Sequence, residues 1–209
     1  MAKTEVEEKF DYLVSKTVWP HFKSLGYKKS GNNFRFYNEK DGLGKIVNFQ
    51  KSIFYDKQHI HFTINIGIYS LEIDKYRSSP QLGAKFLEYN CPIRIRVGAL
   101  LGERDIWFDL NNDIDETKLY SKIEDTFIKN ILPYLSKFDS QKDVFNALLS
   151  KMWLHSYEIK ALFYNGYEKR ALEQLKKEIK RAKETNKEVY LKNLIELEKE
   201  LEFKEKESK

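Results

Sequence analysis

The sequence predicts an α+β protein: an antiparallel sheet of about five strands, packed by an N-terminal helix and by later helices, with a C-terminal helical extension. Two observations carry this prediction. Apolar residues recur with the helical period of 3.6 near both ends of the chain and alternate with polar residues in the middle. The connections between the alternating segments are short, which favours hairpins and antiparallel pairing. We therefore expect a domain over residues 1–140 and a helical extension over residues 141–209.

The first helix is predicted over residues 4–25, where apolar side chains recur at helical spacing and Gly26 follows as a stop signal. Pro20 interrupts this pattern, because proline lacks the N–H that the helix interior needs, and it predicts a kink or a new turn near residues 19–22. A second helix is expected over residues 116–138, after acidic residues that suit a helix N-terminus.

The strands are predicted from alternation of apolar and polar residues. The Asp41-Gly42 pair between the first two is a strong hairpin signal. Residues 71–90 lose both periods and are expected to leave the sheet as an excursion. The predicted strands are Asn33–Asn38, Lys45–Tyr55, Ile60–Ser70, Cys91–Leu100 and Asp105–Leu110.

The last third of the chain is predicted to be helical throughout. One apolar stripe runs from Phe145 through Met152 to Phe163 and ends at Asn165-Gly166, which predicts a single helix there. Two further helices are expected after it. They form either a helical hairpin packed on the domain or a coiled pair through which the chain becomes a homodimer.

Composition bounds the class of protein. Lys and Arg number 37 against 32 Asp and Glu, a net charge of +5 that is too balanced to indicate a nucleic-acid-binding domain. No apolar run reaches the roughly 18 residues that span a bilayer, and the glutamate-rich N-terminus is unlike a signal peptide. The single cysteine, Cys91, excludes an intrachain disulfide and fits a reducing compartment. We expect a cytoplasmic protein that does not associate with membranes.

Catalytic signatures are missing from the sequence. It contains no dinucleotide-binding or phosphate-binding glycine loop, no nucleophile elbow, no H-E-x-x-H and no C-x-x-C. We expect no cofactor and lean against an enzyme. Cys91 is interpreted as a small core residue, because no base that would activate its thiol is evident.

His59 and His61 are weak candidates for metal ligands. Two histidines separated by one residue in a strand point to the same face of the sheet, but a metal site needs at least a third protein ligand, which the sequence does not indicate. Ordinary polar positions at the start of a strand are the favoured interpretation, and no metal is expected.

The polar face of the predicted sheet is the main candidate binding site. Arg94 and Arg96 alternate with apolar residues on the fourth strand, and guanidinium groups bind carboxylates or phosphates bidentately. A solvated sheet face, with each arginine paired to an acid, is the favoured alternative. An acidic stretch that begins at Asp105 and includes residues 113–116 is interpreted as a turn and a helix cap. The other polar positions of this face are Asn48, Gln50, Ser52, Thr63 and Asn65.

The chain resembles the bacterial family catalogued as domain of unknown function 4304 over about residues 8–138. The resemblance rests on several short runs in a fixed order: Leu25-Gly26-Tyr27-Lys28-Lys29, Val47 to Ser52, Phe62 to Ile68, Cys91-x-Ile93-Arg94-Ile95-Arg96-Val97-Gly98, Asp105, Trp107-Phe108 and Leu132-Pro133-Tyr134-Leu135. Phe108 stands where the family more often has Trp. The resemblance implies an α+β fold and no assigned reaction, and it adds Asp105 and Trp107 to the candidate binding residues.

Three functions follow as hypotheses. The first is a non-catalytic binding protein that sequesters one protein partner, as immunity-type proteins do. The second is nucleic-acid binding through a basic helix, although glutamates follow its cations closely and a solvated helix face explains them. The third is an enzyme that acts on a phosphorylated or carboxylated substrate at the Arg94 and Arg96 face. The cations of the basic helix are Lys176, Lys177, Lys180, Arg181 and Lys183.

Overall fold

A computed structural model describes residues 3–53, 56 and 58–207. Its centre is a six-stranded antiparallel sheet with the order β1-β2-β3-β4-β5, in which β6 also pairs with β4. The twelve-residue strand β4 holds the sheet together, because β3 pairs along one edge while β5 and β6 share the other. The strands are β1 (Lys28–Ser30), β2 (Asn33–Asn38), β3 (Leu43–Lys51), β4 (His59–Ser70), β5 (Ile93–Arg96) and β6 (Phe108–Asn111).

The predicted α+β class and antiparallel sheet are confirmed, with differences at the edges. Strand β1 was not predicted, because three exposed polar residues show no apolar alternation. The strand predicted over Cys91–Leu100 is wrong in its second half: only Ile93–Arg96 is strand, and Val97–Leu100 forms the short helix α4. Residues 54 and 55 of the predicted second strand lie outside the described residues.

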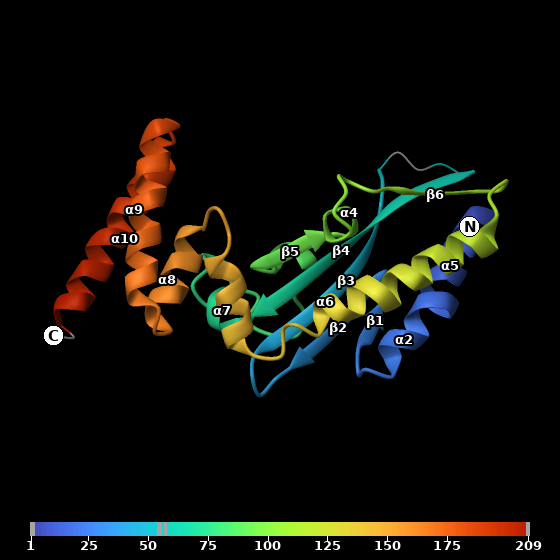
Figure 1. Cartoon of the computed structure of the whole chain (residues 1–209), viewed down its shortest axis with the longest axis horizontal. Coiled ribbons are helices and arrows are strands. Elements are labelled where there is room, and N and C mark those ends of the chain that lie inside the picture. Colours follow the sequence, from blue (N-terminus) through green and yellow to red (C-terminus); the bar gives the residue numbers. More distant parts are fainter. Residues whose placement is uncertain (1–2, 54–55, 57, 208–209) are drawn as a thin grey trace.

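Two helical segments lie side by side and cover one face of the sheet, which we call the helix face (Figure 1). The N-terminal segment is α1 (Glu5–Tyr12), η1 (Leu13–Val18) and α2 (Trp19–Lys23), and the second segment is α5 (Glu116–Thr126), η3 (Phe127–Ile131) and α6 (Leu132–Leu135). They meet at Phe22 and Phe127, whose ring centroids are 5.5 Å apart. Both rings are fully buried in the main hydrophobic core.

Both helical segments contain a π-helical stretch that ends two residues before a proline. Segment η1 precedes Pro20 and segment η3 precedes Pro133. A proline ring has no N–H and crowds the carbonyl one turn earlier, and a widened π turn relieves both problems while the helix continues. The new turn predicted near residues 19–22 therefore corresponds to the start of α2 at Trp19.

The opposite face of the sheet is crossed by the excursion. It begins with α3 (Leu71–Asp74) and includes η2 (Glu88–Asn90), and its residues 84–91, which we call the strap, lie directly on the sheet. A Cβ on Gly44 would lie 2.4 Å from the Phe86 ring, and one on Gly67 would lie 2.6 Å from the Cys91 sulfur. The strap can approach this closely because both strand positions are glycine.

The C-terminal third contains four helices, α7 (Gln141–Leu149), α8 (Ser156–Tyr164), α9 (Glu168–Glu184) and α10 (Glu188–Glu207). The single helix predicted from Phe145 to Phe163 is wrong: residues 150–155 separate α7 from α8, and the Met152 side chain is 92% exposed. Helices α8, α9 and α10 pack together at one end of the sheet (Figure 1). Their buried side chains join the main core, and the domain boundary at residue 140 stays a prediction.

None of the helices among the described residues combines the length and the apolar character that crossing a membrane requires.

Candidate functional site

The strand register places the predicted polar residues in one row across the sheet, on the face opposite the helices. Asn33 of β2 lies opposite Asn48 of β3, Asn48 lies opposite Asn65 of β4, and Asn65 lies opposite Arg96 of β5. Antiparallel partners share a face, so this row, which we call the polar row, runs over four strands. The predicted clustering of Asn48, Asn65 and Arg96 is present, and Asn33 extends it.

Hydrogen bonds connect the polar row through Asn65, which is fully buried. The Asn65 amide nitrogen donates to the side-chain oxygens of Asn48 at 3.2 Å and Gln50 at 2.8 Å, and its oxygen accepts from Arg96 Nε at 3.3 Å. Asn48 in turn donates to Asn33 Oδ1 at 2.9 Å. Because Thr63, whose hydroxyl donates to the Ile106 carbonyl at 2.8 Å, is buried as well, this face is not a simple solvated surface.

Each predicted arginine lies beside an acid. Arg96 forms an ion pair with Asp105, which also accepts a hydrogen bond from the Trp107 indole at 3.0 Å. The Arg96 guanidinium holds the pKa of the Asp105 carboxyl below its ordinary value. Arg94 lies 3.7 Å from a Glu88 carboxylate oxygen. The two guanidiniums are thus neutralised within the chain, and their role toward a ligand stays a prediction.

The remaining candidates have structural contacts. Ser52 donates its backbone N–H to the His61 carbonyl at 2.8 Å. His61 faces Asp109 at 3.6 Å and His59 faces Asp56 at 3.4 Å. The described part of the chain contains no group of three or more metal-ligating side chains.

The structure also shows the surroundings of Cys91 and of the acidic stretch. Cys91 is buried, which raises the pKa of its thiol and suits a core position rather than a nucleophile. Of the acidic stretch, Asp115 accepts from the Lys118 N–H at 3.1 Å and caps α5, whereas Asp105 belongs to the ion pair with Arg96.

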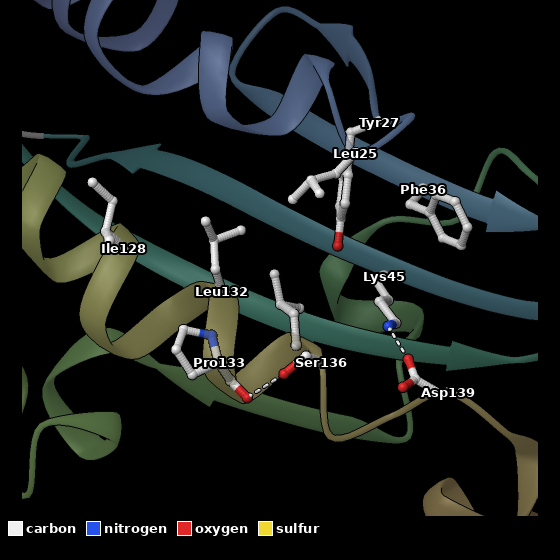
Figure 2. Close-up of a pocket in the computed structure, with 10 residues that line it drawn as sticks. Leu25, Tyr27, Phe36, Lys45, Ile128, Leu132, Pro133, Ser136 and Asp139 are labelled. Carbon is white, nitrogen blue, oxygen red and sulfur yellow. Dashed lines mark hydrogen bonds and ion pairs between the residues drawn. The ribbon is translucent and has the colours of Figure 1, made fainter.

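The helix face holds a groove that the sequence did not indicate, and we call it the apolar groove (Figure 2). Its volume is about 560 Å³, within the usual range for ligand pockets. One wall is the turn between α2 and β1, the other is η3 with α6, and strands β2 and β3 form the floor. Its lining residues are Leu25, Tyr27, Phe36, Lys45, Ile128, Leu132, Pro133, Leu135, Ser136 and Asp139.

Local backbone geometry forms the first wall. Gly26 has a φ of +80°, which ends α2 with the Tyr27 N–H bonded to the Phe22 carbonyl at 3.2 Å. This turn leaves Leu25 at the rim, 52% exposed, and directs Tyr27 inward (Figure 2). Ile128 on the opposite wall is 44% exposed, so apolar surface continues outside the groove.

Few polar groups line the apolar groove. Lys45 Nζ and Asp139 Oδ1 form an ion pair of 3.1 Å at one end. The Tyr27 hydroxyl points into the groove (Figure 2), and burial, with Asp139 nearby, raises its pKa. An apolar surface with two hydroxyls, those of Tyr27 and Ser136, and one ion pair can hold apolar side chains or an apolar small molecule. It supplies no nucleophile paired with a base.

The groove escaped sequence reasoning because its residues come from separate parts of the chain. Leu25 and Ile128 are the apolar residues that could have indicated it. The spacing of residues in the sequence does not show, however, that these two side chains are half exposed in the folded chain.

The fold and its surfaces define an α+β protein with one antiparallel sheet, a buried polar row on one face and an apolar groove on the other. Residues 18–137 match the family described as “Domain of unknown function (DUF4304)”, and the chain belongs to this family. The match agrees with the resemblance over residues 8–138, and α7 to α10 lie beyond it. Neither a curated protein nor a solved structure matches the chain.

Proposed function

We propose that this chain is a non-catalytic binding protein that recognises one protein partner through the apolar groove. The observation that carries the proposal is the apolar surface formed by the groove and its rim, where Leu25 and Ile128 are about half exposed. Clustered apolar side chains of this kind are typical of the centre of protein interfaces. A partner would insert apolar side chains and could hydrogen bond to the Tyr27 hydroxyl.

The finer form of this proposal is a partner-sequestering protein of the immunity type, which acts in the cytoplasm of a bacterium. The lone, buried cysteine supports a reducing compartment. Sequestration requires a tight complex with one stoichiometric partner.

The test compares groove variants with matched surface variants. Leu25→Glu and Ile128→Glu place a carboxylate at the rim, where both side chains are exposed enough for the fold to tolerate the change. Val189→Glu and Met152→Glu, at side chains that are 79% and 92% exposed elsewhere, are the controls. Each tagged full chain is used to capture protein from nuclease-treated native lysate, and the captured protein is quantified by mass spectrometry.

The wild type and both controls should retain the same single protein, and the rim variants should retain at least tenfold less of it. Equal retention by Leu25→Glu would contradict the proposal, and so would a wild type that retains nothing. Native mass spectrometry of the purified chain would detect a bound small molecule, and such a ligand would contradict the proposal that the groove binds a protein.

The two alternative functions have less support. Among the cations of the basic helix α9, Lys180 lies 3.9 Å from Glu184 and Arg181 lies 2.9 Å from Glu178, which lowers the positive potential that nucleic acid would require. Omitting the nuclease from the capture tests this alternative directly. For the enzyme hypothesis, Arg94 and Arg96 each pair with an acid, so a substrate at that face would have to compete with Glu88 and Asp105.

A further inference from the structure

A second pocket, with a volume of about 540 Å³, lies on the face of the sheet opposite the helices, at the edge formed by β1 and β2. The strap closes one side of it. Its charged and polar lining consists of Lys28, Ser30, Arg35, Tyr37, Glu39 and Lys85. Three cations and one carboxylate give this small volume a formal charge of +2.

Two of these cations are direct cross-strand neighbours. Lys28 of β1 pairs with Arg35 of β2 in the antiparallel register, so both side chains emerge on the same face. Like charges directly opposite each other destabilise a strand pair. The strap adds Lys85, and the Arg35 guanidinium donates to the Ala84 carbonyl at 3.3 Å, which fixes it beside the strap.

The three cations differ from three other cations on the sheet that have carboxylate partners. Lys45 pairs with Asp139 at 3.1 Å, Arg94 with Glu88 at 3.7 Å and Arg96 with Asp105. Within residues 3–53, 56 and 58–207, no ion pair engages Lys28, Arg35 or Lys85, even though Glu39 lines the same pocket. The pocket therefore retains uncompensated positive charge.

Protection of a sheet edge does not account for this arrangement. Lysines on an edge strand prevent pairing with other chains, and this role explains Lys28 on β1. It does not explain Arg35, because β2 is paired on both sides. It does not explain Lys85 either, because the strap is not a strand.

We propose that this pocket binds the phosphoryl group of a phosphate monoester. A phosphoryl group carries about −1.5 to −2 at neutral pH, which matches the excess charge of the pocket. The Arg35 guanidinium offers the planar fork that phosphate oxygens accept, and Lys28 and Lys85 add point charges. The volume exceeds what a phosphoryl group fills, so the remainder of the monoester lies against the wall that contains Tyr37.

The test is calorimetric titration of the full-length chain with inorganic phosphate and with phenyl phosphate at low ionic strength. Phenyl phosphate should bind, and it should bind more tightly than inorganic phosphate because its ring contacts the pocket wall. Equal affinities would overturn the monoester assignment. Absence of binding by phenyl phosphate at millimolar concentration would overturn the site.

Three variants assign the binding to the pocket. Lys28→Gln and Arg35→Gln should each weaken phenyl phosphate binding at least tenfold. Lys137→Gln, at an exposed cation that follows Ser136 of the apolar groove in the chain, removes the same charge and should bind like the wild type. Equal weakening by Lys137→Gln would overturn the proposal, because it would show a general charge effect. If Arg35→Gln fails to fold, Lys28→Gln, at an exposed position, still decides the result.

This site is independent of the proposed partner-binding function, because the apolar groove lies on the other face of the sheet. Ile128→Glu, on the groove wall that is remote from the turn at Gly26, should leave phenyl phosphate binding unchanged while it weakens partner capture at least tenfold. Loss of both by this one variant would overturn the separation of the two sites.

Discussion

The two faces of the sheet are stabilised differently, by aromatic packing on the helix face and by side-chain hydrogen bonds on the opposite face. On the helix face, Phe49 lies among the rings of Phe10, Phe34, Phe62 and Phe127, at centroid distances between 5.5 and 6.3 Å. On the opposite face, the same strands carry the polar row, in which amides and a guanidinium bind one another. The comparison teaches that polar residues evident in the sequence can hydrogen bond to one another, while the open pockets lie at the margins of the sheet.

The largest expected effect is on the helix face. Phe49→Ala removes a fully buried ring that stacks on Phe127, and it should lower the free energy of unfolding by about 3–5 kcal/mol, measured by urea denaturation. Phe36→Ala, at a half-buried ring on the groove floor, is the control and should cost clearly less. Similar losses for both would show that the core does not centre on Phe49.

An intermediate effect is expected in the polar row. Asn65→Ala removes the partner of Arg96 Nε and of the side-chain oxygens of Asn48 and Gln50 at partly buried positions, and each group left unsatisfied costs up to about 1–3 kcal/mol. Asn33→Ala, at the more exposed end of the row, should cost less than about 1 kcal/mol, because water can replace it. Chemical denaturation of both variants measures the difference. Equal losses would mean that the row is not organised around Asn65.

The smallest effect is a pH dependence of the Arg96 and Asp105 pair. The pKa of Asp105 is lowered in the folded chain, so the pair stabilises the fold above the unfolded pKa of about 4 and loses this contribution as pH falls through the folded pKa. The melting temperature should therefore fall less steeply between pH 5 and pH 2.5 for Asp105→Asn than for the wild type. Parallel curves would show that Asp105 does not contribute to acid stability.

Much of the fold follows from sequence periodicity, and the failures have physical causes. Alternation located β2 and β4 because one side of each strand faces a dry core. It overran β5, since Val97 and Leu100 continue an apolar pattern after the backbone has turned into α4. The stripe through Met152 predicted one helix, because helical spacing cannot distinguish an exposed apolar side chain from a buried one.

The candidate sites were predicted less completely than the fold. Polar alternation correctly grouped Asn48, Asn65 and Arg96, because antiparallel strands with matching registers bring like faces together. That these side chains hydrogen bond to one another depends on distances that the sequence does not contain. The apolar groove and the pocket at Lys28 and Arg35 are formed by segments that are distant in sequence, so no local sequence pattern predicts them.

We expect the two walls of the apolar groove to differ in mechanical stiffness. The wall of η3 and α6 rests on Phe127, whose ring is locked between Phe22 and Phe49. The wall at Leu25 leads into β1, which is held at the sheet edge by only three residue pairs. Amides of β1 should exchange with deuterated solvent long before those of β4, because short edge segments open locally without global unfolding. We therefore expect the groove to widen at the β1 side, so that the edge strand accommodates a bulky occupant while the rest of the sheet stays intact.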